Sequence, residues 1–353
     1  MEDEILDIGL KPLSASKVKT LENCSWVYWN NYHLKIPQIQ NEGAIKGSIC
    51  HTVFEMLLKI KKKKRLDYFH KIVFANSICA VKSIERLVKK HINLLKLHDT
   101  TAGFVHIDEM ILVGLKNDFF VKGGTLVSPE YEFDFSHSDP TFRIRGLMDK
   151  PFIKGKKIII DDFKSSKKKY AGEDQESNLQ ALFYSFAAKT IWPHLTPVVR
   201  FIFLQHPKDP IMEVKFSDST LNGFKQYLGV IQVRVEGFNE QVSRSNFAAD
   251  KPAGTDTFTG KSLCGWASHP NQLKKDGTKM WHCPYRFAYD YYAVKKDGKM
   301  VYSKLTREEI KTLKDGETVE KLHYSGCPKY VNAIDDFSSP INVKKYPNVL
   351  DDW

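Results

Sequence analysis

Hydrophobic and polar residues alternate along two neighbouring segments in the middle of the chain. Residues 142–149 alternate in part, and residues 158–164 open on three isoleucines, so both are predicted to be strands. Gly155 and the two lysines after it predict a tight turn between them. Two strands joined by a tight turn are expected to be antiparallel neighbours.

The second predicted strand carries two adjacent acids. Side chains on a strand alternate between its two faces, so Asp162 should share a face with Lys164, and Asp161 should lie on the other. A regular hairpin would place Asp149 beside Asp162. Two carboxylates suit Mg²⁺ or Mn²⁺, and a nearby lysine can orient or deprotonate water or stabilise developing negative charge. The alternative is a surface hairpin whose Lys–Asp pair contributes little.

Two segments with helical periodicity carry further polar side chains. Residues 47–58 form an amphipathic pattern that includes His51, and residues 178–191 carry Gln180 and Tyr184 four positions apart, on one helix face. A lone histidine on a helix is usually structural, and the second segment can equally be a core helix with polar groups at its edge.

The remaining patterns predict an α/β chain. Glu130, Glu132 and Asp134 share one face of an expected strand at 129–135, and most of these acids suit a solvated face. Residues from about 66 to 100 predict a basic helical insertion. Further expected elements are strands at 198–205 and 211–216, a helix at 221–235 and a loop at 246–260.

The most informative feature of the composition is the net charge of the chain. A net charge of +11 and a pI near 9.1 favour a polyanionic partner. Lys167, Lys168 and Lys169 follow the acid-bearing strand and are candidates for phosphate contacts, although such a run is usually a solvated face. No stretch is apolar enough to span a membrane and the acidic start is unlike a signal peptide, so a soluble, intracellular protein is expected.

Taken together, the motifs resemble the RecB-type branch of the PD-(D/E)XK nucleases, which includes CRISPR adaptation nucleases and phage exonucleases. The resemblance covers about residues 12–205 and rests on the order of five short motifs. These are GxxxHxxxE from Gly47, an acid-bearing strand, GxxD ending at Asp149, DxK at 162–164 and QxxxY at 180–184.

This resemblance implies a restriction-endonuclease-like fold, with a central mixed β-sheet flanked by helices. It implies a nuclease core over residues 1–240 and a C-terminal segment over 241–353 that packs on it. It also implies roles at the site. The implied metal ligands are His51, Asp149, Asp162 and the backbone carbonyl of Phe163, with Glu130 as an additional acid; Lys164 is the implied catalytic lysine, and Gln180 and Tyr184 support the site or touch DNA.

Six cysteines are spread along the chain, and an intracellular protein should keep them reduced. In the branch that the chain resembles, one N-terminal and three C-terminal cysteines often hold a [4Fe–4S] cluster. Cys24, Cys264, Cys283 and Cys327 are the matching candidates, although their gaps are wider than the usual pattern. A zinc site that includes His282 and incidental free thiols are the alternatives.

The sequence therefore predicts a nuclease that uses Mg²⁺ or Mn²⁺ to hydrolyse DNA, more in the manner of an exonuclease or end-processing enzyme than of a restriction enzyme. Single- or double-stranded DNA is the expected substrate, and a helicase or recombinase is a candidate partner. The competing hypothesis is a nuclease fold retained as a non-catalytic DNA-binding or scaffolding subunit.

Overall fold

The computed structural model describes residues 9–330 apart from 39–41, 96, 98, 252–262, 276 and 278. Most of the loop expected at 246–260 thus lies outside the described residues. The chain divides into two compact units, one formed by Met1–Lys19 with Gln40–Phe238 and the other by Thr20–Ile39 with Asn239–Trp353. The division at 238 lies close to the expected boundary near 240, but Thr20–Ile39 groups with the second unit.

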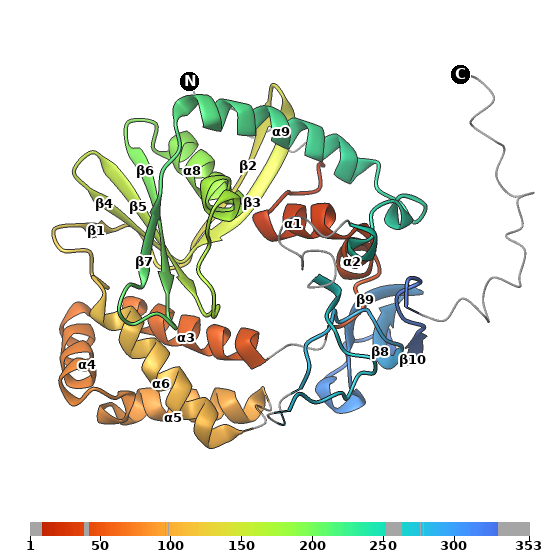
Figure 1. The fold of residues 1–353 in the computed structure, drawn as a ribbon, viewed down its shortest axis with the longest axis horizontal. Coiled ribbons are helices and arrows are strands. Elements are labelled where there is room, and N and C mark those ends of the chain that lie inside the picture. The colour runs from red at the N-terminus through yellow and green to blue at the C-terminus, as the bar shows by residue number, and fades with distance from the viewer. Residues whose placement is uncertain are drawn as a thin grey trace, which may run out of the picture. The chain divides into compact units, whose positions relative to one another are not determined.

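A five-stranded mixed sheet forms the centre of the first unit, in the order β1-β4-β5-β6-β7 (Figure 1). Strands β5 and β6 are parallel, and the other neighbouring pairs are antiparallel. The expected mixed sheet flanked by helices is therefore confirmed. The strands are β1 (Thr125–Leu126), β4 (Lys150–Lys154), β5 (Lys157–Lys164), β6 (Thr196–Phe203) and β7 (Ile211–Val214).

The predicted hairpin forms with a different partner strand. The chain turns at Gly155, which has a φ of +58°, but β5 pairs with β4 rather than with the strand over 142–149. That strand is β3 (Thr141–Met148), and it pairs with β2 (Tyr131–Ser138) in a separate two-stranded sheet. The pairing was wrong because β4 is short and buries its first three residues in succession, so it has no alternation to reveal it. Asp149 consequently lies at the corner between β3 and β4.

Helices cover both faces of the central sheet, as Figure 1 shows. Helix α8 packs against β6 and against α9, while Phe163 and Ile202 of the sheet pack into an apolar cluster with α3 and α6. The expected helical insertion consists of separate helices, α4, α5 and the short η2. The helices of this unit are α3 (Glu42–Lys59), α4 (Lys62–Ala75), η2 (Ile78–Ala80), α5 (Lys82–Leu94), α6 (Thr100–Lys116), α7 (Glu173–Glu176), α8 (Leu179–Ile191) and α9 (Asp218–Glu236).

The second unit contains a three-stranded antiparallel sheet in the order β10-β8-β9. Its buried face contributes Tyr291, Ala293 and Tyr324 to an apolar cluster that also holds Tyr285 and Ile36. The elements are α2 (Ser25–Tyr28), the π-helix η1 (Trp29–His33), the 3-10 helices η3 (Val242–Arg244), η4 (Ala248–Asp250) and η5 (Arg307–Glu309), and strands β8 (Tyr289–Lys296), β9 (Lys299–Lys304) and β10 (Glu317–Tyr324); α1 (Ala15–Asn23) joins the two units along the chain.

The two acids of β5 face opposite sides of the sheet, as the alternation predicts. Asp161 is fully buried, and two cations neutralise it: Lys150 Nζ lies 2.8 Å from Oδ2, and the Arg200 guanidinium donates to both carboxylate oxygens at 2.6 and 2.8 Å. Arg200 also contacts Asp118, 3.1 Å away. This side of β5 is therefore a closed ionic network inside the core.

Removing one member of that network should strongly destabilise the first unit. Asp161→Ala leaves Lys150 and Arg200 buried without their shared counter-charge, which we expect to reduce the free energy of unfolding by about 3–5 kcal/mol. Chemical denaturation followed by circular dichroism measures the change. Glu132→Ala, which breaks an exposed pair with Arg145, is the matched control and should cost about 1 kcal/mol or less. Equal, small effects of both substitutions would contradict this view.

Candidate active site

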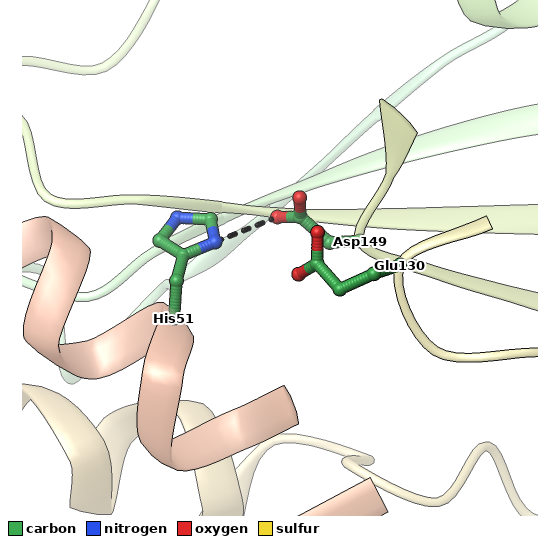
Figure 2. A group of neighbouring side chains, drawn as sticks. All are labelled: His51, Glu130 and Asp149. Atoms are coloured by element: carbon green, nitrogen blue, oxygen red, sulfur yellow. Dashed lines mark ion pairs between the residues drawn. The ribbon is translucent and has the colours of Figure 1, made fainter. Parts of the chain in front are cut away.

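A histidine and two carboxylates converge beside the C-terminal end of β5. His51 of α3, Glu130 and Asp149 each offer a ligand atom, and these atoms all lie within 4.8 Å of one another (Figure 2). The His51 Nδ1 atom lies 3.3 Å from Oδ2 of Asp149, and its Nε2 lies 3.1 Å from the carbonyl oxygen of Phe163. With the proton on Nε2, the Nδ1 lone pair is on the side of the Asp149 carboxylate; with the proton on Nδ1, the Nε2 lone pair is on the side of the Phe163 carbonyl.

The corner between β3 and β4 is built to hold both acids. The Asp149 carboxylate accepts a hydrogen bond from the backbone N–H of Phe163 at 3.0 Å, which fixes it to β5. Glu130 precedes β2 and has a φ of +50°, an uncommon conformation for a residue other than glycine. Its N–H donates to the Asp149 carbonyl at 2.9 Å. The strained backbone conformation at Glu130 therefore goes together with a carboxyl group that lies against Asp149.

Asp162 lies outside this compact group, on the α8 side of β5, at 2% exposure. Its Oδ1 accepts from Gln180 Nε2 at 2.8 Å and lies 3.1 Å from the Tyr184 hydroxyl. Lys164 Nζ lies 2.5 Å from Oδ2 of Asp162 and donates to Gln180 Oε1 at 2.7 Å. Tyr184 in turn donates to the carbonyl of Leu147, 2.8 Å away. Gln180 and Tyr184 therefore hold the Asp162–Lys164 pair in place.

Local packing explains why the helices reach the strand end. A Cβ atom on Gly47 would lie 2.4 Å from Oγ and 3.1 Å from Cβ of Ser165, so a larger residue at this position would force Ser165 at the end of β5 to shift. Helix α8 begins at a side-chain cap, where Asn178 accepts from the N–H of Ala181 at 3.1 Å. The i,i+4 spacing then places Gln180 and Tyr184 on the face toward β5.

The electrostatics of the site are unbalanced toward negative charge. Burial and the charge of Asp162 raise the pKa of Asp149 to about 7. Burial also raises the pKa of Glu130, where His51 acts in the opposite direction. Burial lowers the pKa of Lys164, but its interactions with Asp162, Tyr170 and Asp149 together outweigh burial and raise the lysine pKa above its usual value. Lys164 is therefore a cation at neutral pH.

The donor set fits a hard divalent cation. It offers carboxylate oxygens and one imidazole nitrogen, which suit Mg²⁺ or Mn²⁺. Among the described residues, the buried Oδ2 of Asp162 accepts no hydrogen bond, although the Lys164 ammonium lies beside it. A cation would also relieve the mutual repulsion that raises the pKa of Asp149.

Within the described part of the chain, the lysine run after β5 divides into one lysine with an ion-pair partner and two without. Lys169 pairs with Asp209 at 2.6 Å, and its Nζ lies 5.9 Å from the centre of the Phe203 ring. Lys167 and Lys168 are exposed. One neighbour that the sequence did not single out is Tyr170, whose ring packs edge-on against Phe201 and Phe203 and which contributes to the raised pKa of Lys164. Its position directly after the lysine run is the signal that could have identified it.

The second unit brings four of the six cysteines together. Cys24, Cys264 and Cys327 are buried, Cys283 is half-buried, and all four are free thiols. They line one cavity of about 210 Å³. Burial raises the pKa of Cys283 to about 12 and that of Cys327 to about 11, and in each case the neighbouring cysteines add to the shift. Cys50 is buried in the apolar cluster of α3, and Cys79 is exposed.

The spacing of the four sulfurs distinguishes between metal centres. A tetrahedral zinc site with Zn–S bonds of about 2.3 Å needs sulfurs roughly 3.8 Å apart. Within the described part of the chain, no three cysteine sulfurs lie within 4.8 Å of one another. A [4Fe–4S] cluster also takes four thiolates, but its four iron atoms hold them farther apart than a single ion does.

Comparison with known proteins gives one informative match. Residues 12–249, more than half of the chain, match the family model described as the PD-(D/E)XK nuclease superfamily. No curated protein matches. The solved structure titled "Crystal structure of SSO0001" aligns with 68% of this chain and 93% of that chain at 10% identity, with a TM-score of 0.23, too low to carry an argument. None of the described helices has the length and apolar character needed to cross a membrane.

The raised pKa of Asp149 predicts a pH-dependent stability. In the folded protein this carboxyl keeps its proton up to about pH 7, whereas in the unfolded chain it loses it near pH 4, so its contribution to stability falls as pH rises through that window. In Asp149→Asn this contribution is absent. The drop in melting temperature between about pH 5 and about pH 8 should therefore be a few degrees smaller for the metal-free variant than for the metal-free wild type.

Mn²⁺ provides the internal control for this prediction. Because a proton on Asp149 competes with a cation, added Mn²⁺ should stabilise the wild type more at about pH 8 than at about pH 5, and it should stabilise Asp149→Asn little at either. Parallel melting profiles for the two proteins, with and without Mn²⁺, would rule out the raised pKa and the cation site together.

Proposed function

Because the chain belongs to the PD-(D/E)XK nuclease superfamily, we propose that it is a divalent-metal-dependent DNA nuclease that processes DNA ends. The observation that carries the proposal is the convergence of His51, Asp149 and Glu130 beside the Asp162–Lys164 pair. These are a cation-binding group and a cationic lysine at one strand end, which is the arrangement that phosphodiester hydrolysis needs.

The metal ligands in this proposal are His51, Asp149, Asp162 and the carbonyl of Phe163, with Glu130 as a further carboxylate. When bound, Mg²⁺ or Mn²⁺ polarises a phosphoryl oxygen and lowers the pKa of a coordinated water. The hydrogen bond from the Phe163 N–H keeps Asp149 directed at the site.

Lys164 acts on the phosphate and the attacking water. Its raised pKa makes it a donor of hydrogen bonds and positive charge rather than a base, so it orients the water and stabilises negative charge on the phosphoryl oxygens. Gln180 and Tyr184 are positioning residues, since they contact Lys164 and Asp162. The proton of the attacking water must then leave to solvent or to a carboxylate such as Glu130, whose raised pKa suits that role.

DNA and its ends are proposed as the substrate for two reasons. The chain carries a net charge of +11, and exposed Lys167 and Lys168 follow the catalytic strand, which favours a polyanion. The order of the motifs resembles the RecB-type branch, whose members include exonucleases. That resemblance also supports a helicase or recombinase as a partner.

Cleavage assays on matched DNA substrates test the proposed activity. The wild type should release nucleotides from end-labelled linear DNA with Mg²⁺ or Mn²⁺ and should leave circular DNA intact. Lys164→Ala and Asp162→Asn should each lower the rate by about 10²–10³-fold or more, because each removes a group that acts on the reacting phosphate. Lys189→Ala, which breaks an exposed pair with Asp218, should cleave normally.

Three outcomes separate the alternatives. Equal cleavage of circular DNA would replace the end-processing role with an endonuclease. Full activity of Lys164→Ala and Asp162→Asn would refute the site. DNA binding without any cleavage under either metal would identify the chain as a non-catalytic nuclease-fold subunit.

We also propose that Cys24, Cys264, Cys283 and Cys327 hold a [4Fe–4S] cluster in the second unit. Support comes from their common cavity and from the electrostatic interactions of Cys283 and Cys327 with the other cysteines, which place the thiols near one another. Thiols buried this way stay protonated unless a metal centre compensates the thiolate charge. The cluster would fasten the segment at Cys24 to the C-terminal part of the same unit.

Iron and sulfide analysis of anaerobically purified protein tests the cluster. The wild type should be brown and contain about four iron and about four acid-labile sulfide per chain. Cys283→Ala should lose the colour and melt at a lower temperature, whereas Cys79→Ala, at an exposed cysteine, should retain both. Stoichiometric zinc in place of iron, or a colourless wild type after anaerobic reconstitution, would refute the cluster.

A further inference from the structure

One arginine of the second unit contacts all three C-terminal segments that carry the cavity cysteines. The N–H of Arg286 donates to the carbonyl oxygen of Cys283 at 3.0 Å, and its own carbonyl accepts from the N–H of Cys327 at 3.3 Å. The side chain reaches the third segment, where Nη1 lies 3.4 Å from the carbonyl oxygen of Cys264 and also donates to that of Gly265. Arg286 therefore lies where these three segments meet.

Aromatic rings hold the guanidinium of Arg286 in place. Its central carbon lies 4.1 Å from the centre of the Tyr330 ring and 5.4 Å from that of the Phe287 ring. Tyr330 is itself fixed to a cysteine segment, because its N–H donates to the carbonyl of Cys327 at 2.9 Å. Both Arg286 and Tyr330 line the same cavity as the four cysteines. A planar guanidinium that is stacked on a ring and bonded to carbonyls has a well-defined orientation at this cavity.

The charge and one hydrogen-bond donor of Arg286 have no protein partner. Among the described residues, no carboxylate lines the cavity, and Arg286 is the one lysine or arginine that does. Asp250, whose charge acts on Cys264, pairs with Lys329 instead, 2.8 Å away. The Nε–H of Arg286 is buried and, within the described ranges, has no acceptor. A buried donor without an acceptor is costly, so an anion in the cavity would stabilise this side chain.

We infer that Arg286 donates a hydrogen bond to a sulfur of the [4Fe–4S] cluster and thereby raises the reduction potential of the cluster. This rests on the proposed cluster and adds to it the residue that sets its potential. A [4Fe–4S] core held by thiolates is an anion, and accepting one electron makes it more negative. Net charge and hydrogen bonds to the sulfurs are among the factors that set such potentials. A fixed guanidinium offsets the added charge, so it favours the reduced state.

Redox titration of the full chain, reconstituted anaerobically, measures this effect without requiring DNA cleavage. Dithionite donates one electron to each cluster, and the loss of visible absorption gives the midpoint potential. At a fixed potential, Arg286→Gln should lower the ratio of reduced to oxidised cluster about tenfold, which corresponds to a midpoint about 59 mV more negative. Arg286→Lys keeps the positive charge but loses the planar fork, so its midpoint should lie between those of the wild type and Arg286→Gln.

Arg307→Gln is the matched control, because Arg307 lies in the same unit, is exposed and donates to the carbonyl of Ile310 at 3.2 Å. Its midpoint should equal that of the wild type. A purely structural role of Arg286 would lower the melting temperature and iron content of Arg286→Gln but leave the midpoint of the remaining cluster unchanged, and this result would overturn the inference. Loss of all iron from both Arg286 variants would overturn it as well, since Arg286 would then serve assembly of the cluster.

Failure of the inference can be told apart from failure of the proposed cluster. If the wild type holds about four iron per chain and Arg286→Gln has the same midpoint, the role of Arg286 is refuted and the cluster stands. If the reconstituted wild type is colourless, the cluster fails first, and the inference fails with it. Neither result bears on the candidate active site, whose residues belong to the first unit.

Discussion

Asp161 and Asp162 are neighbours on β5, and the strand directs their carboxylates to opposite faces of a buried sheet. A buried carboxylate is tolerated only with positive or hydrogen-bonding partners around it, so each face must supply its own. Strands β4 and β6 provide Lys150 and Arg200 for Asp161. Helix α8 and the strand itself provide the partners of Asp162. The packing of strands and helices around β5 follows from this requirement.

The two faces differ in whether the neutralisation is complete. Around Asp161 two cations meet one fully buried carboxylate, with Asp118 at the edge of the network, and the arrangement is closed. On the other side, among the described residues, the cationic or basic neighbours of Asp162, Asp149 and Glu130 are the Lys164 ammonium and the His51 imidazole, with the charge of Lys59 also acting on Glu130. Burial is the main cause of the raised pKa values of Asp149 and Glu130, and the neighbouring carboxylates add to both shifts. A divalent cation supplies the missing charge, which is why this face, and not the other, is the candidate for chemistry.

Much of this arrangement could be predicted from local patterns. Period-two alternation indicated which acid accompanies Lys164, and helical periodicity identified the segments that carry His51, Gln180 and Tyr184. The partner strand of β5 escaped prediction because β4 has no alternation, and the position of Glu130 depends on a backbone conformation that no pattern encodes. The resemblance named the four cysteines as one set, but no local pattern shows that Cys24 and the three C-terminal cysteines line one cavity, because that depends on contacts between distant parts of the chain.

The central claim is that the face of β5 bearing Asp162 holds a divalent cation with the help of His51 and Asp149, while the face bearing Asp161 holds none. Crystals grown with Mn²⁺ and measured at the manganese absorption edge test it directly. The account predicts an anomalous peak between Asp149 and Asp162 beside His51, and its disappearance in Asp149→Asn. A peak elsewhere in the first unit, or none at saturating Mn²⁺, would contradict it.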